Sequence, residues 1–201
     1  GRREPLKARV ISLNQFVRSN AEILSRLLGG SGRLELALAR NAGRVRTNPT
    51  QFQQVLLNLI LNARDALRGK GRVIIRTGRR EVQSGLNRRA TDAPPGRYVC
   101  LSVSDNGVGM DAETQHQLFE PFFTTKPEGE GSGLGLSLVY GVVQQSGGFI
   151  NVKSELSVGS TFEILLPETH EPLSAPVRAA MIEPLPSTSG HESVLLVEED
   201  D

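Results

Sequence analysis

Apolar residues recur at helical spacing in three long segments of the chain. The first segment carries a stripe that a glycine pair closes after residue 28: Leu13, Phe16, Val17, Ile23, Leu24, Leu27 and Leu28. The second, NPTQFQQVLLNLILNARDAL, begins with a proline at its second position and runs for about 18 residues without a helix breaker. We therefore expect helices over these two segments, a third over 133–146 and a short one over 111–118.

Segments between these helices read as strands, because polar and apolar residues alternate in them or apolar residues run together. We expect strands at 33–39, 43–47, 72–82, 96–105, 148–156 and 160–167. Strands and helices in this mixed order favour an α/β fold, a two-layer sandwich in which helices cover one sheet. After Pro167 the pattern stops. Residues 168–191 read as a proline-rich linker, and SVLLVEEDD, within residues 192–201, reads as the opening strand of another domain.

The composition limits the possible classes of protein. With 201 residues, of which 38% are hydrophobic, the chain can bury one good-sized core. No apolar run approaches the roughly 18 residues that span a bilayer, and no signal peptide opens the sequence. We expect a cytoplasmic domain, whose parent protein is still free to carry a membrane anchor. The single Cys100 has no internal disulfide partner, and we expect it to be a small core residue.

The net charge of +1 hides an asymmetry along the chain. Residues 1–90 hold 19 Lys and Arg against 5 Asp and Glu, whereas residues 91–201 hold 4 against 17. A basic half can indicate nucleic-acid binding. Aromatic residues make up only 4% of the chain, too few for a base-stacking platform. We therefore interpret the arginines as a solvated basic face and expect no nucleic-acid partner.

Polar residues interrupt the long helix at a spacing that places them on one face. Asn58, Asn62 and Asp65 follow one another at i, i+4 and i+7. A buried carboxamide costs free energy unless its hydrogen bonds are satisfied. A single Asn can serve as a polar link within a core, but a pair one turn apart, followed by a carboxylate, favours a cleft that holds a ligand.

Two glycine-rich stretches accompany this helix. SDNGVGM places Asp105 before Gly107 and Gly109, which is either an ordinary tight turn or half of a nucleotide pocket. In GEGSGLGLSLVYGVV, alternating glycines precede a helix start, where backbone N–H groups can approach an anion, although such loops are also common on surfaces. Between them, LFEPFFTTK supplies Lys126, which can reach a phosphate from a lid, and three phenylalanines that are more typical of a core.

Taken in order, NLILNARDA, DNGVGM, LFEPFFTTK, GSGLGL and GSTFEILLP resemble the motifs of the ATP-binding catalytic domain of sensor histidine kinases. That domain belongs to the ATPase superfamily that includes DNA gyrase and MutL, and FEPFFTTK is typical of the nitrogen-regulator subtype. The resemblance covers about residues 10–167, and it implies a catalytic domain over 12–167. It implies a mixed sheet of about five strands, with about three helices on one face and a mobile lid over ATP.

The resemblance also implies roles for single residues. Asn62 matches the ligand of Mg²⁺, a hard cation that a carboxamide oxygen suits. Asp105 matches the residue that accepts from the exocyclic amine of adenine, which favours ATP over GTP, and Lys126 adds charge near the γ-phosphate. The implied catalytic residues are Asn58, Asn62 and Lys126. The other residues implied to line the nucleotide site are Asp65, Ala66, Gly107, Gly109, Met110, Phe122, Gly131, Ser132, Gly133, Leu134, Gly135, Leu136 and Thr161.

Asn58 separates two classes of enzyme. In the gyrase-like members of the superfamily, a Glu stands one turn before the magnesium ligand and can take a proton from attacking water. An amide cannot act as a base, whereas a histidine nucleophile has its own lone pair. Asn58 therefore favours phosphotransfer to histidine over ATP hydrolysis.

None of the histidines, His116, His170 and His191, has the context of a phosphoacceptor. The resemblance therefore implies an acceptor on a separate dimerisation domain upstream, of which residues 1–11 would be the exit. SVLLVEEDD is similar to the first strand of a receiver domain, although Glu199 stands where Asp is usual. The expected parent is a homodimeric hybrid kinase that hands its phosphoryl group to a phosphotransfer or response-regulator protein.

Two other interpretations stay open at this point. A superfamily ATPase that uses hydrolysis to drive a conformational change is disfavoured by Asn58 and by the receiver-like tail. The third interpretation is a nucleotide-binding module without activity, or a basic nucleic-acid adaptor.

Overall fold

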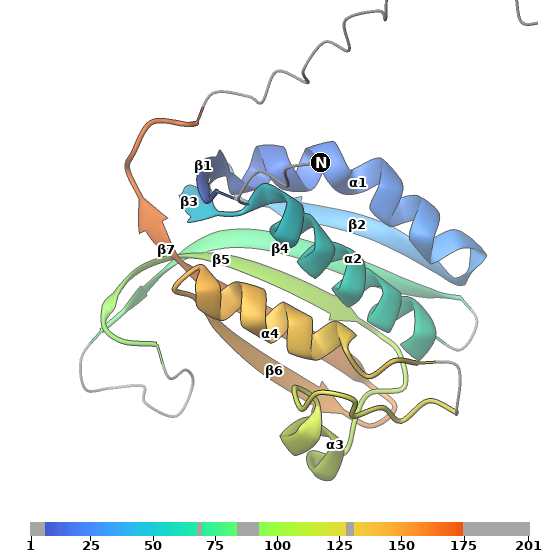
Figure 1. Cartoon of the computed structure of the whole chain (residues 1–201). Coiled ribbons are helices and arrows are strands. Elements are labelled where there is room, and N and C mark those ends of the chain that lie inside the picture. Colours follow the sequence, from blue (N-terminus) through green and yellow to red (C-terminus); the bar gives the residue numbers. More distant parts are fainter. Residues whose placement is uncertain (1–6, 68–69, 84–92, 128–130, 175–201) are drawn as a thin grey trace, which may run out of the picture.

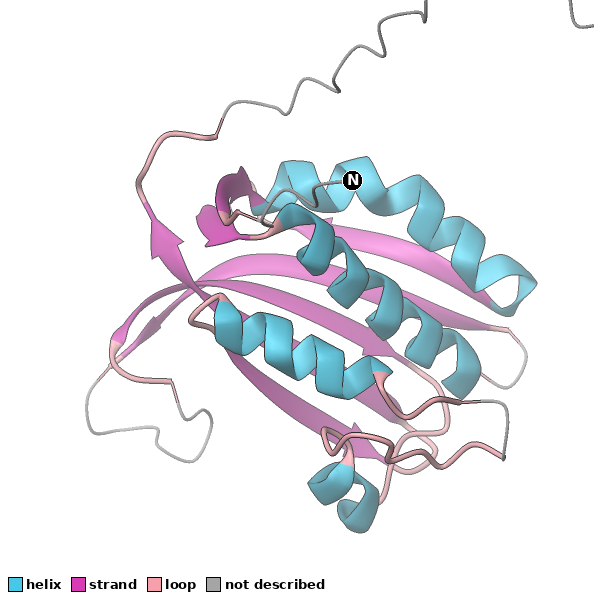
Figure 2. Ribbon diagram, viewed as in Figure 1, coloured by secondary structure: helices cyan, strands magenta, loops and turns pink. Residues whose placement is uncertain are grey.

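The computed structural model describes residues 7–67, 70–83, 93–127 and 131–174. In these residues, helices cover one face of a sheet (Figure 1, Figure 2). The helices are α1 (Leu13–Leu28), α2 (Pro49–Ala66), α3 (Ala112–Gln117) and α4 (Gly135–Gln145), with a 3₁₀ turn, η1 (Gly29–Ser31), after α1. The strands are β1 (Arg9–Ser12), β2 (Gly32–Leu38), β3 (Arg44–Thr47), β4 (Gly71–Val82), β5 (Gly96–Asp105), β6 (Phe149–Glu155) and β7 (Gly159–Thr169).

The sheet is mixed, as the sequence predicted. β2 and β4 pair in parallel, whereas β4 with β5, β5 with β7 and β7 with β6 are antiparallel pairs. The short strands β1 and β3 pair with each other, and β3 joins the end of β7 through two residue pairs. The α/β fold class is confirmed, with seven strands in the sheet. β1 is an addition to the predicted strands.

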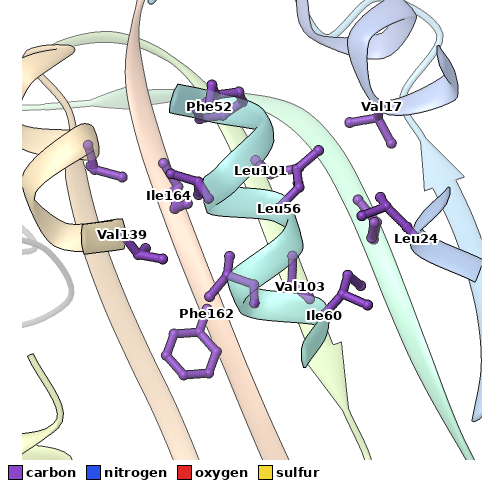
Figure 3. Packing of buried hydrophobic residues seen from close by; sticks show 14 of the residues in the cluster. Val17, Leu24, Phe52, Leu56, Ile60, Leu101, Val103, Val139, Phe162 and Ile164 are labelled. Carbon is purple, nitrogen blue, oxygen red and sulfur yellow. The ribbon is translucent and has the colours of Figure 1, made fainter. Parts of the chain in front are cut away.

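Local sequence signals explain where α2 begins and which face it buries. The Asn48 side chain accepts hydrogen bonds from the backbone N–H groups of Thr50 at 3.0 Å and Gln51 at 3.2 Å, and Pro49 opens the helix. The buried residues of the helix are Phe52, Val55, Leu56, Leu59, Ile60 and Ala63. Figure 3 shows three of them, Phe52, Leu56 and Ile60, among core residues of α1, α4 and the sheet. The same periodicity leaves the polar face of α2 outside this apolar stripe.

α4 begins two residues later than predicted. Gly133 has a φ of +65°, in the left-handed region that an α-helix excludes. A Cβ atom at this position would lie 2.3 Å from the carbonyl carbon of Phe122. The chain therefore turns sharply at Gly133, and regular helix starts only at Gly135.

Cys100 lies in a second, smaller cluster beside the main core. Its neighbours Val99 and Leu101 are buried in the main core, so the alternation of β5 points Cys100 to the opposite face of the sheet, near Tyr98. Burial, together with the nearby Glu163 carboxylate, raises the pKa of the Cys100 thiol to about 12. The thiol is therefore protonated at neutral pH, as expected of a packing residue.

None of the described helices is long and apolar enough to cross a membrane.

A substitution at Leu56 tests whether the core lies under α2 as described. Its side chain is fully buried, so Leu56→Ala leaves a cavity under α2 and should lower the free energy of unfolding by about 2–5 kcal/mol. Denaturant titration followed by circular dichroism measures this change. Leu57→Ala, on the partly exposed flank of the same helix, is the matched control and should cost clearly less. Equal losses for the two variants would contradict this packing.

Candidate functional site

The C-terminal end of α2, the start of α4 and the loops after β5 and β6 lie together at one end of the molecule (Figure 1). Asn58 Nδ2 donates to the Gly135 carbonyl oxygen at 3.2 Å, which joins α2 to α4. The Val108 N–H donates to the Ala66 carbonyl oxygen at 3.1 Å, and the Ser157 N–H donates to the Val108 carbonyl oxygen at 2.7 Å. We call this region the candidate site.

Two carboxamides of α2 belong to the candidate site. Asn58 accepts from Gln54 Nε2 at 3.3 Å in addition to its bond with α4. One turn later, Asn62 Nδ2 is buried without a hydrogen-bond partner, and it is the one side-chain N or O atom of the described residues left in this state. Leaving a buried polar atom unpaired costs about 1–3 kcal/mol. The Asn62 carboxamide is therefore suited to a ligand that the chain itself does not supply.

Asp105 ends β5 with a partly buried carboxylate. Its Oδ1 accepts from the backbone N–H of Gly107 at 2.8 Å and from that of Ser160 at 3.3 Å. Both bonds end on Oδ1, which leaves Oδ2 available to a ligand. Burial raises the pKa of Asp105, and hydrogen bonds from the backbone N–H groups of Gly107, Ser160 and Asp105 itself only partly offset this effect.

This raised pKa predicts a pH-dependent gain in stability for Asp105→Asn. The folded state holds the Asp105 proton to higher pH than the unfolded chain, so ionisation lowers stability as the pH rises above the ordinary pKa of 3.8. Asn does not titrate and keeps an acceptor oxygen. The difference in melting temperature, variant minus parent, should therefore increase from acidic to neutral pH. Thermal melts followed by circular dichroism measure this difference. A difference that is constant with pH would contradict a buried charge.

The loop after β5 approaches the β6–β7 turn so closely that a side chain is excluded. Gly109 has a φ of +68°, and a Cβ atom there would lie 1.9 Å from the Glu155 carbonyl oxygen. The Met110 N–H donates to Ser154 Oγ at 2.8 Å, and the Met110 side chain packs against the main core. The loop that contains Asp105, Gly107 and Gly109 is therefore held in one conformation by its backbone.

Lys126 reaches back to α2. Its ammonium group forms an ion pair with Asp65, which also accepts from Arg64 at 2.9 Å. Burial alone would raise the pKa of Asp65, but the hydrogen bonds and charges of Lys126 and Arg64 together lower it. The segment that carries Lys126 is thus fastened to the polar face of α2, one turn beyond Asn62.

The glycine-rich segment adjoins the same polar face. Gly135, at the start of α4, lies against Asn58, and Gly131 lies against Lys126 and Thr124. The Leu134 N–H donates to Ser132 Oγ at 3.4 Å, and Leu136 packs against the core. Gly129 falls outside the described residues.

Two predicted residues do not turn their side chains toward the others. Phe162 is buried in the main core, so alternation places Thr161 on the opposite face of the sheet, where its hydroxyl donates to Ser104 Oγ at 2.9 Å. Phe122 is 74% exposed, and its φ is +68°. Its backbone N–H still donates to the Gly133 carbonyl oxygen at 3.0 Å.

Two serines that the sequence analysis missed support the Asp105 loop. The hydroxyls of Ser154 and Ser160 lie 2.9 Å apart, and Ser154 Oγ donates to the Gly159 carbonyl oxygen at 3.0 Å. Ser160 is 4% exposed. In β7, Ser160 and Phe162 both point toward the core. A serine at a position where the alternating pattern calls for an apolar residue was the sequence signal that could have identified it.

No metal cluster of His, Cys, Asp and Glu is present in the described part of the chain. His116 and His170 are exposed, and His191 lies outside the described residues. Any metal at the candidate site would therefore rely on isolated oxygen ligands such as the Asn62 carboxamide.

Comparisons with known proteins identify a matching family and several similar proteins. A family model described as histidine kinase-, DNA gyrase B- and HSP90-like ATPase matches residues 47–170. The chain is similar to the sensor kinase CckA of Brucella abortus (strain 2308), with 39% identity over 205 residues that cover all of this chain but only 22% of that protein. Among solved structures, it is similar to the mycobacterial sensor histidine kinase MprB, with a TM-score of 0.62 and 25% identity over 80% of this chain and 97% of that one. It is also similar to full-length ShkA in complex with AMPPNP, with a TM-score of 0.65 and 25% identity over 90% of this chain and 35% of that one.

Proposed function

This chain belongs to the family of histidine kinase-, DNA gyrase B- and HSP90-like ATPases, and on that premise we propose that it is the ATP-binding catalytic domain of a two-component sensor histidine kinase. It would transfer the γ-phosphate of Mg-ATP to a histidine on a separate dimerisation domain. The likeness to two proteins named as sensor kinases supports this assignment.

The observation that carries the proposal is the identity and position of Asn58. Its carboxamide is bound to Gly135 at the start of α4 and to Gln54 on its own helix. An amide in this position cannot take a proton from water, whereas a histidine acceptor needs no such base to attack a phosphoryl group. The site therefore favours transfer to histidine over hydrolysis.

Asp105 is the proposed adenine contact. Its Oδ1 is occupied by two backbone N–H groups, so Oδ2 can accept from the exocyclic amine of adenine. Guanine presents a carbonyl oxygen at the same place, which a carboxylate would repel. The similar protein ShkA was solved in complex with AMPPNP, an ATP analogue, and this supports a nucleotide with an adenine base.

Asn62 is the proposed protein ligand of Mg²⁺. The Asn62 carboxamide oxygen would suit this ion, since Mg²⁺ keeps most of its oxygen ligands from phosphates and water and needs few from the protein. The unpaired Nδ2 of the same side chain is a hydrogen-bond donor, which suits a phosphate oxygen. When bound, Mg²⁺ would neutralise charge on the phosphates. Lys126 would add a second positive charge there once it leaves Asp65, and the start of α4 would face the phosphates with free backbone N–H groups.

We extend the proposal to the whole protein on the same grounds. Residues 1–11 would be the exit from the dimerisation domain, 12–167 the catalytic domain, 168–191 a linker and 192–201 the start of a receiver. The sheet itself includes β1 and runs to Thr169. The proposed partners are the homodimer's own dimerisation domain, the receiver and a downstream regulator, as parts of a phosphorelay.

Incubation of this chain with γ-labelled ATP tests the proposal. Alone, the chain should bind Mg-ATP without labelling itself and should hydrolyse ATP slowly, since Asn58 offers water no base. Addition of the upstream domain as a separate chain should produce acid-labile, base-stable label typical of phosphohistidine. The yield should depend steeply on concentration, because separate chains lack the high effective concentration that a linker provides.

The alternatives give different results in the same assay. Fast hydrolysis without any acceptor would favour an ATPase that drives a conformational change. Stoichiometric labelling that disappears on substitution of His116, His170 or His191 would place the acceptor inside this chain and contradict the proposal.

A further inference from the structure

A second polar region lies at the other end of α2, which for 18 residues is about 27 Å long. There, a cavity of about 330 Å³ opens between the start of α1 and the loop that joins β2 to β3. Its lining includes the arginines Arg18, Arg40 and Arg44, and no carboxylate among the described residues lines it. We call it the basic cavity.

The arginines of the basic cavity are poorly neutralised. Arg44 donates to a backbone carbonyl oxygen, that of Glu171, at 3.0 Å. Within the described residues, Arg18 and Arg40 have no hydrogen-bond or ion-pair partner. Like charges that share a cavity repel one another. An anion bound between the arginines would therefore reduce this electrostatic repulsion.

A second cavity adjoins the basic cavity and differs from it in how its arginine is neutralised. It has a volume of about 250 Å³ and shares Asn41, Gly43 and Arg44 with the basic cavity. There the additional arginine, Arg79, pairs with the Glu168 carboxylate at 2.8 Å. Within the described residues, the chain thus supplies a counter-charge to one cavity and not to the other.

The wall of the basic cavity is fixed by buried hydrogen bonds. Asn14 Nδ2 donates to the Ala39 carbonyl oxygen at 2.7 Å, and Asn14 Oδ1 accepts from Thr77 Oγ1 at 2.6 Å. The Ala39 N–H donates to the same Thr77 hydroxyl at 3.2 Å. These bonds hold the loop that carries Arg40 against α1, so little order would have to be gained on binding.

We propose that the basic cavity binds a small phosphate-bearing anion. Guanidinium groups match phosphate oxygens with paired N–H donors, and two of the three here are free to do so. The first turn of α1 contains no acidic residue, and the Ser12 side chain does not cap it, so this turn places no negative charge against an anion. Its Leu13 N–H already donates to the Gly43 carbonyl oxygen at 3.4 Å. This site is separate from the candidate nucleotide site and does not depend on its assignment.

An NMR titration of the protein with inorganic pyrophosphate, without Mg²⁺ or nucleotide, tests the proposal. The side-chain Nε–H signals of Arg18 and Arg40 should shift and saturate. The double variant Arg18→Ala/Arg40→Ala should bind about tenfold more weakly or worse, since two charge-assisted contacts are lost. Arg33→Ala, which removes an exposed arginine at the far end of β2, is the matched control and should bind as the parent does.

Three results would overturn the proposal. The first is the absence of a saturable shift at either arginine. The second is an equal loss of affinity in the Arg33→Ala control, which would indicate general charge attraction. The third is a set of shifts confined to the amides of Gly133 and Gly135, since pyrophosphate would then occupy only the candidate nucleotide site.

Discussion

Asp105→Asn is expected to weaken ATP binding by about 1.5–3 kcal/mol, roughly a factor of 10 to 150, because the proposed charge-assisted hydrogen bond to adenine would be lost. The asparagine keeps an oxygen for the N–H groups of Gly107 and Ser160, so the loop should keep its conformation. Isothermal titration calorimetry with ATP, and with GTP as a second ligand, measures the change. The preference for ATP over GTP should shrink along with the affinity.

Asp111→Asn is the matched control for this experiment. Asp111 caps α3 by accepting from the Thr114 N–H at 2.8 Å, and asparagine is an equally good capping residue. The control removes one negative charge six residues from Asp105 and should leave ATP affinity unchanged. If Asp105→Asn binds ATP as tightly as the parent does, Asp105 is not the adenine contact.

Asn62→Ala is expected to abolish phosphotransfer once the chain is joined to its dimerisation domain, a loss of about two orders of magnitude or more. The reason is the removal of the oxygen that we propose as a ligand of Mg²⁺. Stability should hardly change, because Asn62 Nδ2 has no partner within the described protein to lose. Labelling rates measured over a range of Mg²⁺ concentrations, together with thermal melting curves, separate the two effects.

Asn62→Asp keeps an oxygen ligand in the same place and serves as the conservative variant. It should retain Mg²⁺-dependent labelling that the alanine variant lacks. Full activity of Asn62→Ala with the same Mg²⁺ dependence as the parent would place the metal ligand elsewhere.

The fold and the polar face of α2 could be predicted from the sequence because both depend on short-range periodicity. The spacing of apolar residues located α2, and the same spacing left Asn58 and Asn62 on one face. The start of α4 was placed too early, because the Gly133 conformation is imposed by the Phe122 backbone, eleven residues away. A contact of that kind has no local pattern.

The contacts that shape the candidate site are also long-range, and this is why several of them were missed. Ser154 and Ser160 support the Asp105 loop from strands that follow it by about fifty residues. The contacts of Thr161 also depend on the fold. Its place in the GSTF motif suggested a ligand contact, and in the structure its hydroxyl donates to Ser104.

The ion pair between Lys126 and Asp65 would make Asp65 a competitor of ATP for the same ammonium group. On the proposed function, Lys126 must leave Asp65 before it can contact a γ-phosphate, so the measured affinity is the intrinsic affinity reduced by the fraction of molecules with a free lysine. Both side chains are about one-third exposed, and dissolved salt therefore weakens their attraction. Added salt thus releases the lysine while it screens the phosphates. The two effects oppose each other, and ATP affinity should fall less steeply with ionic strength than the charge of the phosphates alone would dictate.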